Sequence, residues 1–162
     1  MTGNYAYIDG ANLHKGIQEL GWKLDYQRFR VFLKDRYAVE TAYLFLGFIP
    51  QNTAMYRNLQ DAGFVLVFKP TIFNAAGEVK GNCDAELVLQ ATSDFYEKKY
   101  SQAVIVTGDG DFACLVSFLK ARQGLLVVLS PNHKKCSRLL TRAKVRLTFL
   151  EEFRETLRDA SK

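Results

Sequence analysis

Short apolar runs alternate along the chain with segments in which apolar residues recur at helical spacing. The runs predict β-strands at 5–8, 39–48, 64–68, 103–106 and 125–129, and a last strand, at a sheet edge, at 145–150. The helically spaced segments predict helices at 13–20, 25–36, 51–62, 82–95, 112–122, 134–143 and 151–160. Because strands and helices alternate throughout, the pattern predicts an α/β fold with a mainly parallel sheet and helices on both faces.

The segment at 71–80 breaks this alternation. It has two short extended arms around the tetrapeptide AsnAlaAlaGly, which is typical of a β-hairpin. A projecting hairpin can act as a lid, guide a substrate or simply connect two elements, and the pattern does not choose between these roles. With 162 residues and no repeat, low-complexity tract or linker, we expect residues 1–162 to form one domain.

Carboxylates stand directly after two of the predicted strands. Asp9 follows the first strand, and Asp109 and Asp111 lie in the strand-to-helix turn ValThrGlyAspGlyAspPhe at 106–112. The carboxyl ends of parallel strands share one edge of a sheet, where open α/β folds bind their ligands. Two acids one residue apart repel each other unless a cation or a shared proton relieves them. The alternative is that an aspartate in such a turn caps the next helix.

A further acid, Asp84, lies in the first turn of the helix predicted at 82–95. Because this helix feeds the fourth strand, we expect Asp84 at the opposite pole of the sheet unless the excursion at 71–80 returns the chain to the carboxyl edge. The excursion is long enough for that return, and the pattern leaves both placements open. The helix dipole also favours acids in a first turn, which is a purely structural explanation.

The net charge of +5 is unevenly distributed, because residues 133–146 include six basic residues and no acid. Such a segment fits a polyanionic partner, and a solvated helix face explains it equally well. Several of these residues are three or four apart, so a helix would present them together to a nucleic-acid backbone. The set comprises Lys134, Lys135, Arg138 and Arg142. Lys15 and Lys80, near the acids in sequence, are further candidates for phosphate contacts, with solvated lysines as the alternative.

Cysteine usage and the N-terminus indicate the compartment. The three cysteines are widely spaced and form no CxxC pair, so neither a disulfide framework nor a thiolate zinc site is indicated. The N-terminus lacks a basic segment followed by a long apolar one. No apolar run approaches the roughly 18 residues that span a bilayer. We therefore expect a soluble, cytoplasmic protein with no membrane partner.

Nucleotide-cofactor motifs are incomplete. Gly108 and Gly110 imitate the start of a GxGxxG motif, but Ala113 stands where the third glycine belongs. The turn also follows the fourth predicted strand, which argues against a dinucleotide site. No GxxxxGK[ST] string occurs, which argues against an ordinary nucleoside-triphosphate loop.

Three separated motifs resemble the NYN domain family. They are TyrIleAspGlyAlaAsnLeu at 7–13, LysGlyAsnCysAspAlaGluLeu at 80–87 and ValThrGlyAspGlyAspPhe at 106–112. The resemblance is to the LabA-like branch, within the PIN-like nuclease superfamily, and it extends through SerProAsn at 130–132 and PheLeuGluGluPhe at 149–153. It implies a Rossmann-like, three-layer domain that binds Mg²⁺ or Mn²⁺ and hydrolyses RNA phosphodiester bonds.

Carried onto this sequence, the resemblance implies a metal-binding set that joins Asp84 to the other acids. The set comprises Asp9, Asp84, Asp109 and Asp111, with Asn12 as a polar accompaniment in the catalytic site. Gln90 is a departure, because we expect family members to carry another aspartate one to two turns into that helix. Thr107, just before the acid pair, is a candidate to hydrogen-bond one carboxylate, with a purely structural role as the alternative.

The leading hypothesis is a divalent-metal-dependent ribonuclease that acts on single-stranded RNA able to enter a crevice at the sheet edge. Hard cations prefer carboxylate oxygens, and such ions activate water and neutralise charge on the attacked phosphate. Two alternatives stay open: an RNA-binding or regulatory module with little or no cleavage, and a metal-dependent phosphatase or nucleotide hydrolase. The oligomeric state is also open, a homo-oligomer included.

Overall fold

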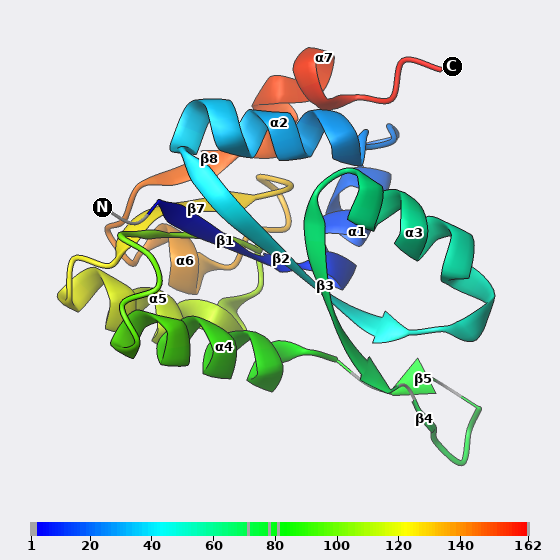
Figure 1. Cartoon of the computed structure of the whole chain (residues 1–162), viewed down its shortest axis with the longest axis horizontal. Helices are drawn as coiled ribbons and strands as arrows, with labels where there is room; N and C mark the ends of the chain where they lie inside the picture. Colours follow the sequence, from blue (N-terminus) through cyan, green and yellow to red (C-terminus); the bar gives the residue numbers. More distant parts are fainter. Residues whose placement is uncertain (1–2, 71, 78, 81, 162) are drawn as a thin grey trace.

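A parallel sheet runs through the molecule, with helices on both of its faces (Figure 1). The computed structural model describes residues 3–70, 72–77, 79–80 and 82–161. Within these ranges, six strands lie in the order β3-β2-β1-β6-β7-β8, and every neighbouring pair is parallel. The prediction of an α/β fold with a mainly parallel sheet is therefore confirmed.

The strands lie close to where the apolar runs predicted them. They are β1 (Asn4–Asp9), β2 (Val39–Phe48), β3 (Phe64–Pro70), β6 (Ala103–Val106), β7 (Leu125–Ser130) and β8 (Leu147–Phe149). All residues of β6, in the middle of the sheet, are buried. A strand that is covered on both faces has an uninterrupted apolar sequence, which explains why the runs located it.

Helices cover both faces of the sheet. On one face lie α1 (Gly10–Gln18), α2 (Tyr26–Tyr37), α3 (Thr53–Asp61) and α7 (Arg154–Leu157). On the other lie α4 (Asp84–Tyr96), α5 (Ala113–Ala121) and α6 (Arg138–Thr141). Short 3-10 turns, η1 (Pro50–Asn52), η2 (Gly110–Phe112) and η3 (Leu150–Phe153), lead into α3, α5 and α7. Together they make three layers.

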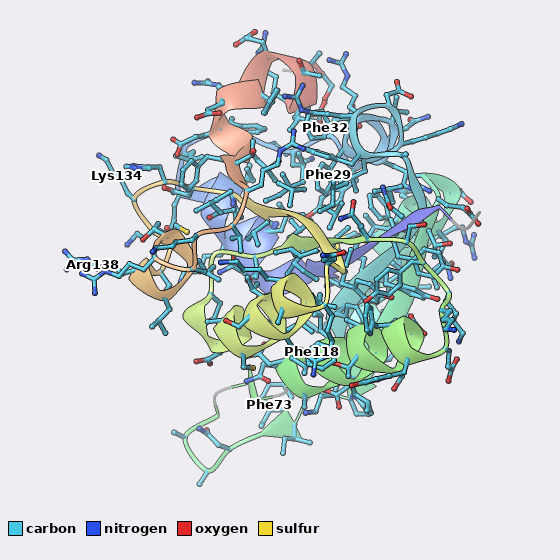
Figure 2. The ribbon with its side chains drawn as sticks, turned by 90° about the vertical axis from the view of Figure 1, so that its left-hand side faces the viewer. Phe29, Phe32, Phe73, Phe118, Lys134 and Arg138 are labelled. Carbon is cyan, nitrogen blue, oxygen red and sulfur yellow. The ribbon has the colours of Figure 1, made fainter. Side chains whose placement is uncertain are left out.

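Alternate residues of the central strands supply two separate cores. Ala6 and Ile8 of β1 face the first core, which includes Phe29 of α2, labelled in Figure 2. Tyr7, between them in sequence, faces the second core together with Leu87 of α4. Successive strand residues point to opposite faces, so one short strand anchors both helical layers.

A buried polar network crosses the second core. Asp94 of α4 is fully buried, and it accepts hydrogen bonds from the hydroxyl of Tyr7 at 2.7 Å and from Nε2 of Gln90 at 3.0 Å. The ammonium Nζ of Lys99 lies 3.3 Å from the same carboxylate. Burial and the Asp94 carboxylate raise the pKa of the Tyr7 hydroxyl. A buried charge needs such partners, so Asp94 has a structural role in this network.

The segment after β3 forms the predicted hairpin. Its strands β4 (Ile72–Phe73) and β5 (Val79–Lys80) pair antiparallel, and residues 71, 78 and 81 lie outside the described part. The hairpin projects beyond the carboxyl end of β3 (Figure 1). Phe73, at this projecting end in Figure 2, is 70% exposed.

The basic segment forms a shorter helix than the charge spacing predicted. The prediction was a helix at 134–143, whereas α6 begins only at Arg138. Ser137 fixes this start, because its Oγ accepts the N–H of Leu139 at 3.2 Å and its N–H donates to the carbonyl of Gly108 at 2.9 Å. Pro131 is buried in a packed loop before this point. The prediction that one helix face carries the whole basic set is therefore wrong.

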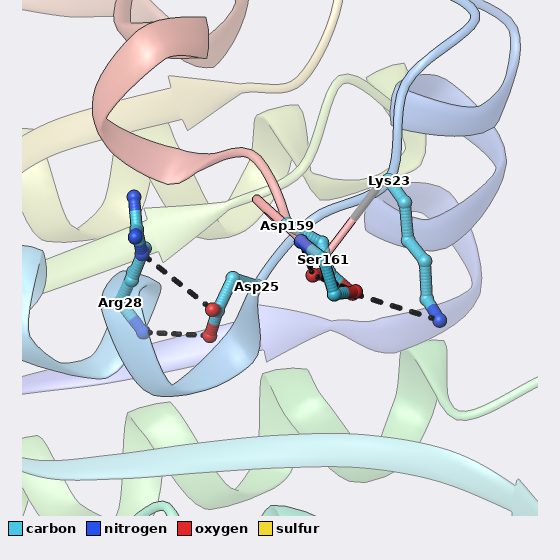
Figure 3. Close-up of polar contacts among 5 residues, drawn as sticks. All are labelled: Lys23, Asp25, Arg28, Asp159 and Ser161. Atoms are coloured by element: carbon cyan, nitrogen blue, oxygen red, sulfur yellow. Dashed lines mark hydrogen bonds and ion pairs between the residues drawn. The ribbon is translucent and has the colours of Figure 1, made fainter.

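The C-terminal segment is tied to the start of α2 (Figure 3). The helix predicted at 151–160 is divided between η3 and α7, which ends at Leu157. Beyond it, the N–H of Asp159 donates to the carbonyl of Lys23 at 2.8 Å, so backbone pairing replaces further helical turns. Close by, Asp25 caps α2, because its Oδ1 accepts the N–H of Arg28 at 3.1 Å.

The three cysteines, Cys83, Cys114 and Cys136, are all free. Burial raises the pKa of the Cys83 and Cys136 thiols. Since the thiolate is the reactive form, both thiols are less reactive than an exposed cysteine.

Within the described ranges, no helix is both long and apolar enough to cross a membrane.

Candidate metal centre

The crevice of the sheet opens between β1 and β6. The chain leaves β1 toward β2 and β3 on one side, and it leaves β6 toward β7 and β8 on the other. Such a reversal of strand order creates a crevice at the carboxyl ends of the two strands, where open α/β sheets bind ligands. Asp9 is the last residue of β1, and Asp109 follows β6, which ends at Val106. The fold therefore brings these two acids to the crevice.

Asp84 reaches the same edge from a third element. It is the first residue of α4, which follows β3 and the hairpin and leads to β6. Because β3 is parallel to β2 and β1, its carboxyl end lies at the same edge as Asp9, and a crossover helix starts near that end. The expectation that Asp84 needs the hairpin to escape the opposite pole is therefore wrong. Only the C-terminal end of α4, which leads to the start of β6, lies at the opposite pole of the sheet.

Asp9, Asp84 and Asp109 form a compact group. Each offers one carboxylate oxygen, and these oxygens lie within 4.8 Å of one another. All three residues are half-buried. Among the described residues, no ion pair joins any of them to a lysine or arginine. Like charges at this distance favour a shared proton or a cation, so the group is suited to holding a metal ion.

Hydrogen bonds hold the acids of β1 and β6 in place. Oδ1 of Asp9 accepts the N–H of Asn12 at 3.3 Å, and its Oδ2 accepts the hydroxyl of Thr107 at 3.1 Å. Thr107 is fully buried, and its Oγ1 also accepts the N–H of Asp109 at 3.1 Å. Oδ1 of Asp109 accepts the N–H of Asp111 at 2.9 Å. The hydroxyl of Thr107 thus makes the carboxylate contact for which the sequence made it a candidate, and it joins the two segments.

Asn12 ties α1 to the turn after β6. Its Oδ1 accepts the N–H of Gly108 at 2.8 Å. A Cβ at position 108 would lie 2.8 Å from Oγ of Ser130, so a larger residue there would force that side chain to move. Because the oxygen of Asn12 is used in this way, its amide Nδ2 is the group left to donate to a ligand.

The same carboxylates also cap helices. Asp9 is the N-cap of α1 and Asp109 is the N-cap of η2, each through one side-chain oxygen. An ionised carboxylate has two oxygens with about four acceptor positions, so capping leaves others available. Capping and cation binding are therefore compatible at both residues.

Burial and mutual repulsion disfavour the ionised acids. The pKa of Asp9 is raised from 3.8 to about 6, chiefly by burial and also by the Asp84 and Asp109 carboxylates, while hydrogen bonds from its neighbours oppose the shift. The pKa of Asp84 is raised by burial and by the charges of Asp109 and Asp111. Positive charge favours ionised carboxylates, so a cation among them would lower both pKa values.

Asp111 and Lys69 lie beside the compact group. Asp111 is exposed in η2, and its charge contributes to the raised pKa of Asp84. The charge of Lys69, at the end of β3, opposes that shift in pKa, and its Nζ lies 3.5 Å from Oε1 of Glu86. Lys69 was not among the sequence candidates, because the strand predicted at 64–68 ends before it, whereas β3 extends to Pro70. Its position at a strand's carboxyl end was the available signal.

The structure divides the predicted nucleic-acid-binding residues into two places. Lys15 on α1 and Lys135 in the loop before α6 line a polar groove together with Asn12. The side chain of Lys80 lies outside the described part of the structure. Lys15 and Lys135, which are far apart in sequence, thus share one surface.

The remaining basic residues lie around α6. Arg138 is the first residue of this helix and Arg142 is its C-cap, and both are exposed. Figure 2 shows Arg138 and Lys134 pointing outward from this part of the molecule. These side chains are open to solvent and available to a partner.

Comparisons with known proteins agree with this architecture. The low amplitude and bright protein LabA of Synechococcus elongatus is 27% identical over 136 residues, which cover 78% of this chain and 72% of that protein. The crystal structure of a protein of unknown function from Vibrio parahaemolyticus matches with a TM-score of 0.79 at 21% identity, over 98% of this chain and 97% of that one. This structural likeness shows the fold. The NYN domain family model matches residues 5–151, which include Asp9, Asp84 and Asp109, and the chain therefore belongs to the NYN domain family.

Proposed function

We propose that this protein is a divalent-metal-dependent ribonuclease that hydrolyses phosphodiester bonds at the group formed by Asp9, Asp84 and Asp109. The observation that carries the proposal is the convergence of three carboxylates from three separate elements at the crevice of the sheet, within 4.8 Å of one another. Membership of the NYN family, whose domain is of a nuclease type, supports the same function.

The donor set suits Mg²⁺ or Mn²⁺. Both ions take oxygen ligands. Mg²⁺ holds its ligands at about 2.0–2.1 Å in an octahedron, so two ligands of one ion lie at most about 4.2 Å apart. The 4.8 Å limit of the group exceeds that value only slightly, and a small side-chain rotation or an intervening water closes the difference. Asp111, exposed at the rim, completes the proposed metal-binding set.

The residues of the site have separate tasks in this proposal. Asp9, Asp84 and Asp109 hold the cation, which when bound makes water a better nucleophile and neutralises charge on the attacked phosphate. Thr107 keeps the two strand ends in register through its hydroxyl. Asn12, whose oxygen is used by the backbone, offers its Nδ2 to a phosphate oxygen. These roles need no covalent nucleophile from the protein.

We assign single-stranded RNA as the substrate. Lys15, Lys135 and Arg138 are exposed on the elements around the crevice, where they can neutralise a phosphate backbone without sequence preference. A flexible strand enters a crevice at a sheet edge more readily than a rigid duplex does. The choice of RNA rests on the NYN family.

The test is hydrolysis of a labelled single-stranded RNA with Mn²⁺ or Mg²⁺, in parallel with EDTA. We expect ion-dependent cleavage that falls on the order of 10²-fold or more in Asp9→Asn and Asp109→Asn, since each change removes a ligand charge. Asp35→Asn, an exposed acid on α2, is the matched control and should cleave like the wild type. Full activity in both site variants would remove the assignment of the site.

A second function, RNA binding without cleavage, is favoured by one observation. Gln90 of α4 has no charge and donates to the buried Asp94, so neither residue adds to the acidic group. A site with fewer acids binds a cation more weakly. RNA that is bound but stays intact with Mn²⁺ present would support this alternative. Nucleotides are screened beside RNA in the same assay. Hydrolysis of nucleotides without cleavage of RNA would indicate a small-molecule phosphatase instead.

A further inference from the structure

A polar groove of about 200 Å³ adjoins the carboxylate group. Asn12 and Gly108 line the groove and are joined by a hydrogen bond. Gly108 directly precedes Asp109 in the chain, so the groove begins next to the carboxylates. The groove runs between α1 and the loop that joins β7 to α6, and these two elements contribute Lys15 and Lys135 to its lining. An RNA strand that is bound at the carboxylates and leaves them on this side would enter the groove.

The floor of the groove is a close contact between α1 and the loop after β7. A Cβ at Gly16 would lie 2.7 Å from Cβ of Pro131, so this position needs glycine. Asn132 is only 5% exposed, and its Nδ2 donates to the carbonyl of Gly16 at 3.3 Å. Its Oδ1 accepts the N–H of Lys134 at 3.0 Å, so both ends of its amide hold the loop. The groove is therefore a fixed feature of the fold.

The groups around the groove favour an anion. Lys15 and Lys135 are exposed, and neither belongs to an ion pair among the described residues. Glu19 also lines the groove, so two positive charges face one negative charge. Asn12 adds its Nδ2 as a neutral donor. Lysine charges and amide donors of this kind recognise phosphate oxygens.

We propose that this groove binds a phosphodiester group of the RNA strand next to the one that is cleaved, through Lys15 and Lys135. The inference rests on the proposed function, which it extends from the carboxylates to substrate binding. Pockets that enclose whole drug-sized ligands measure roughly 300–1,000 Å³. The groove has about 200 Å³, which lies below that range. It therefore fits a sugar-phosphate unit of a longer chain better than a complete nucleotide cofactor.

The test compares two matched double variants, Lys15→Ala/Lys135→Ala and Lys34→Ala/Lys98→Ala. Lys34 lies in the last turn of α2 and Lys98 follows α4, so the control pair is at the amino edge, away from the groove. Each pair removes two exposed positive charges.

Binding of a fluorescein-labelled single-stranded RNA is measured by anisotropy in EDTA, where the proposed hydrolysis stops. KM and kcat are measured with Mn²⁺. We expect the groove pair to bind RNA roughly tenfold more weakly and to reduce the salt-dependence slope by about 1.4, which corresponds to two lost phosphate contacts on a single strand. KM should rise while kcat stays unchanged. The control pair should match the wild type.

Neutral methylphosphonate linkages locate the contact along the RNA. One such linkage beside the cleaved bond should weaken binding to the wild type, and the same linkage should have no further effect in the groove pair. Glu19→Gln should tighten binding in this assay, because it removes the negative charge from the groove.

The outcomes separate this inference from the proposed function. RNA cleavage by the wild type, with equal KM in the groove and control pairs, would overturn the groove assignment and leave the ribonuclease intact. Weaker RNA binding by the groove pair, without any cleavage by the wild type, would support the groove and overturn the hydrolysis. If the groove pair loses affinity for adenosine monophosphate and keeps its affinity for RNA, the occupant is a free nucleotide and the proposal fails.

Discussion

Removing the charge of Asp9 should stabilise the metal-free protein at neutral pH. The pKa of Asp9 is raised from 3.8 to about 6, and a shift of about two units corresponds to roughly 3 kcal/mol in favour of the uncharged side chain in the folded state. Asp9→Asn keeps the size of the side chain and an oxygen for the N–H of Asn12, and the raised pKa already includes the opposing hydrogen bonds from Asn12 and Thr107. We therefore expect a gain of about 2–3 kcal/mol in the free energy of unfolding.

The gain should depend on pH with a defined sign. Because the pKa of Asp9 is higher in the folded state than in the unfolded chain, the folded protein binds the proton more tightly. The stability that this group contributes is complete below pH 3.8 and is lost as the pH rises through about 6. The difference between Asp9→Asn and the wild type should therefore vanish below about pH 4 and be complete above about pH 7.

Urea unfolding in EDTA at several pH values measures this difference. Asp35→Asn, with its exposed position on α2, is the control and should change the free energy of unfolding by less than about 0.5 kcal/mol. Mn²⁺ should reverse the order, because the wild type gains about 4.1 kcal/mol when the ion is at about 1,000 times its Kd, whereas Asp9→Asn gains little. A variant less stable than the wild type in EDTA at neutral pH, or a gain of equal size in acid, would refute the reasoning.

Three further changes test the contacts around the site. Thr107→Ala should destabilise the fold by about 1–3 kcal/mol, because it leaves the N–H of Asp109 without its acceptor; urea unfolding and Mn²⁺ titration should both recover in Thr107→Ser, and no recovery would contradict the role of the hydroxyl. Lys69→Ala should tighten Mn²⁺ binding about two- to fivefold, because it removes a nearby positive charge; calorimetric titration that finds weaker binding would reverse the assigned sign. Tyr7→Phe should cost about 2–3 kcal/mol, because the buried Asp94 loses a hydroxyl donor at 2.7 Å. Its Mn²⁺ affinity should be unchanged, and stability equal to the wild type would show that the network is dispensable.

The apolar runs located the sheet because its central strands are covered on both faces. Val104 and Ile105 are neighbours in β6, yet they pack in different cores, so no polar alternation interrupts the run. The places of Asp9 and Asp109 at strand ends followed from the same pattern, and the parallel pairing of β1 with β6 brings them to one edge. The same rule places Asp84 at this edge, because α4 follows β3 and a helix that follows a parallel strand starts near the carboxyl end of that strand. In the sequence, only the family motif joined Asp84 to the other acids, because the excursion at 71–80 separates the strand from the helix.

The loop before α6 could not be predicted from charge spacing, because contacts distant in sequence determine its path. Asn132 bonds to the carbonyl of Gly16, and Ser137 bonds to the carbonyl of Gly108. Such contacts leave no periodic trace in the sequence. Lys135 therefore looks like part of a basic helix in the sequence, whereas the folded chain places it in a groove with α1.

Helix capping and cation binding both favour an aspartate at the carboxyl edge of the sheet. Helices that follow parallel strands begin there, so Asp9 caps α1, Asp109 caps η2 and Asp84 opens α4 around one crevice. For a single aspartate, capping is a sufficient explanation. Three carboxylates within 4.8 Å disfavour one another's ionisation, as the raised pKa values of Asp9 and Asp84 indicate. Asparagine or serine would cap about equally well without that repulsion. The charge itself therefore needs a second explanation, and a bound divalent cation supplies it.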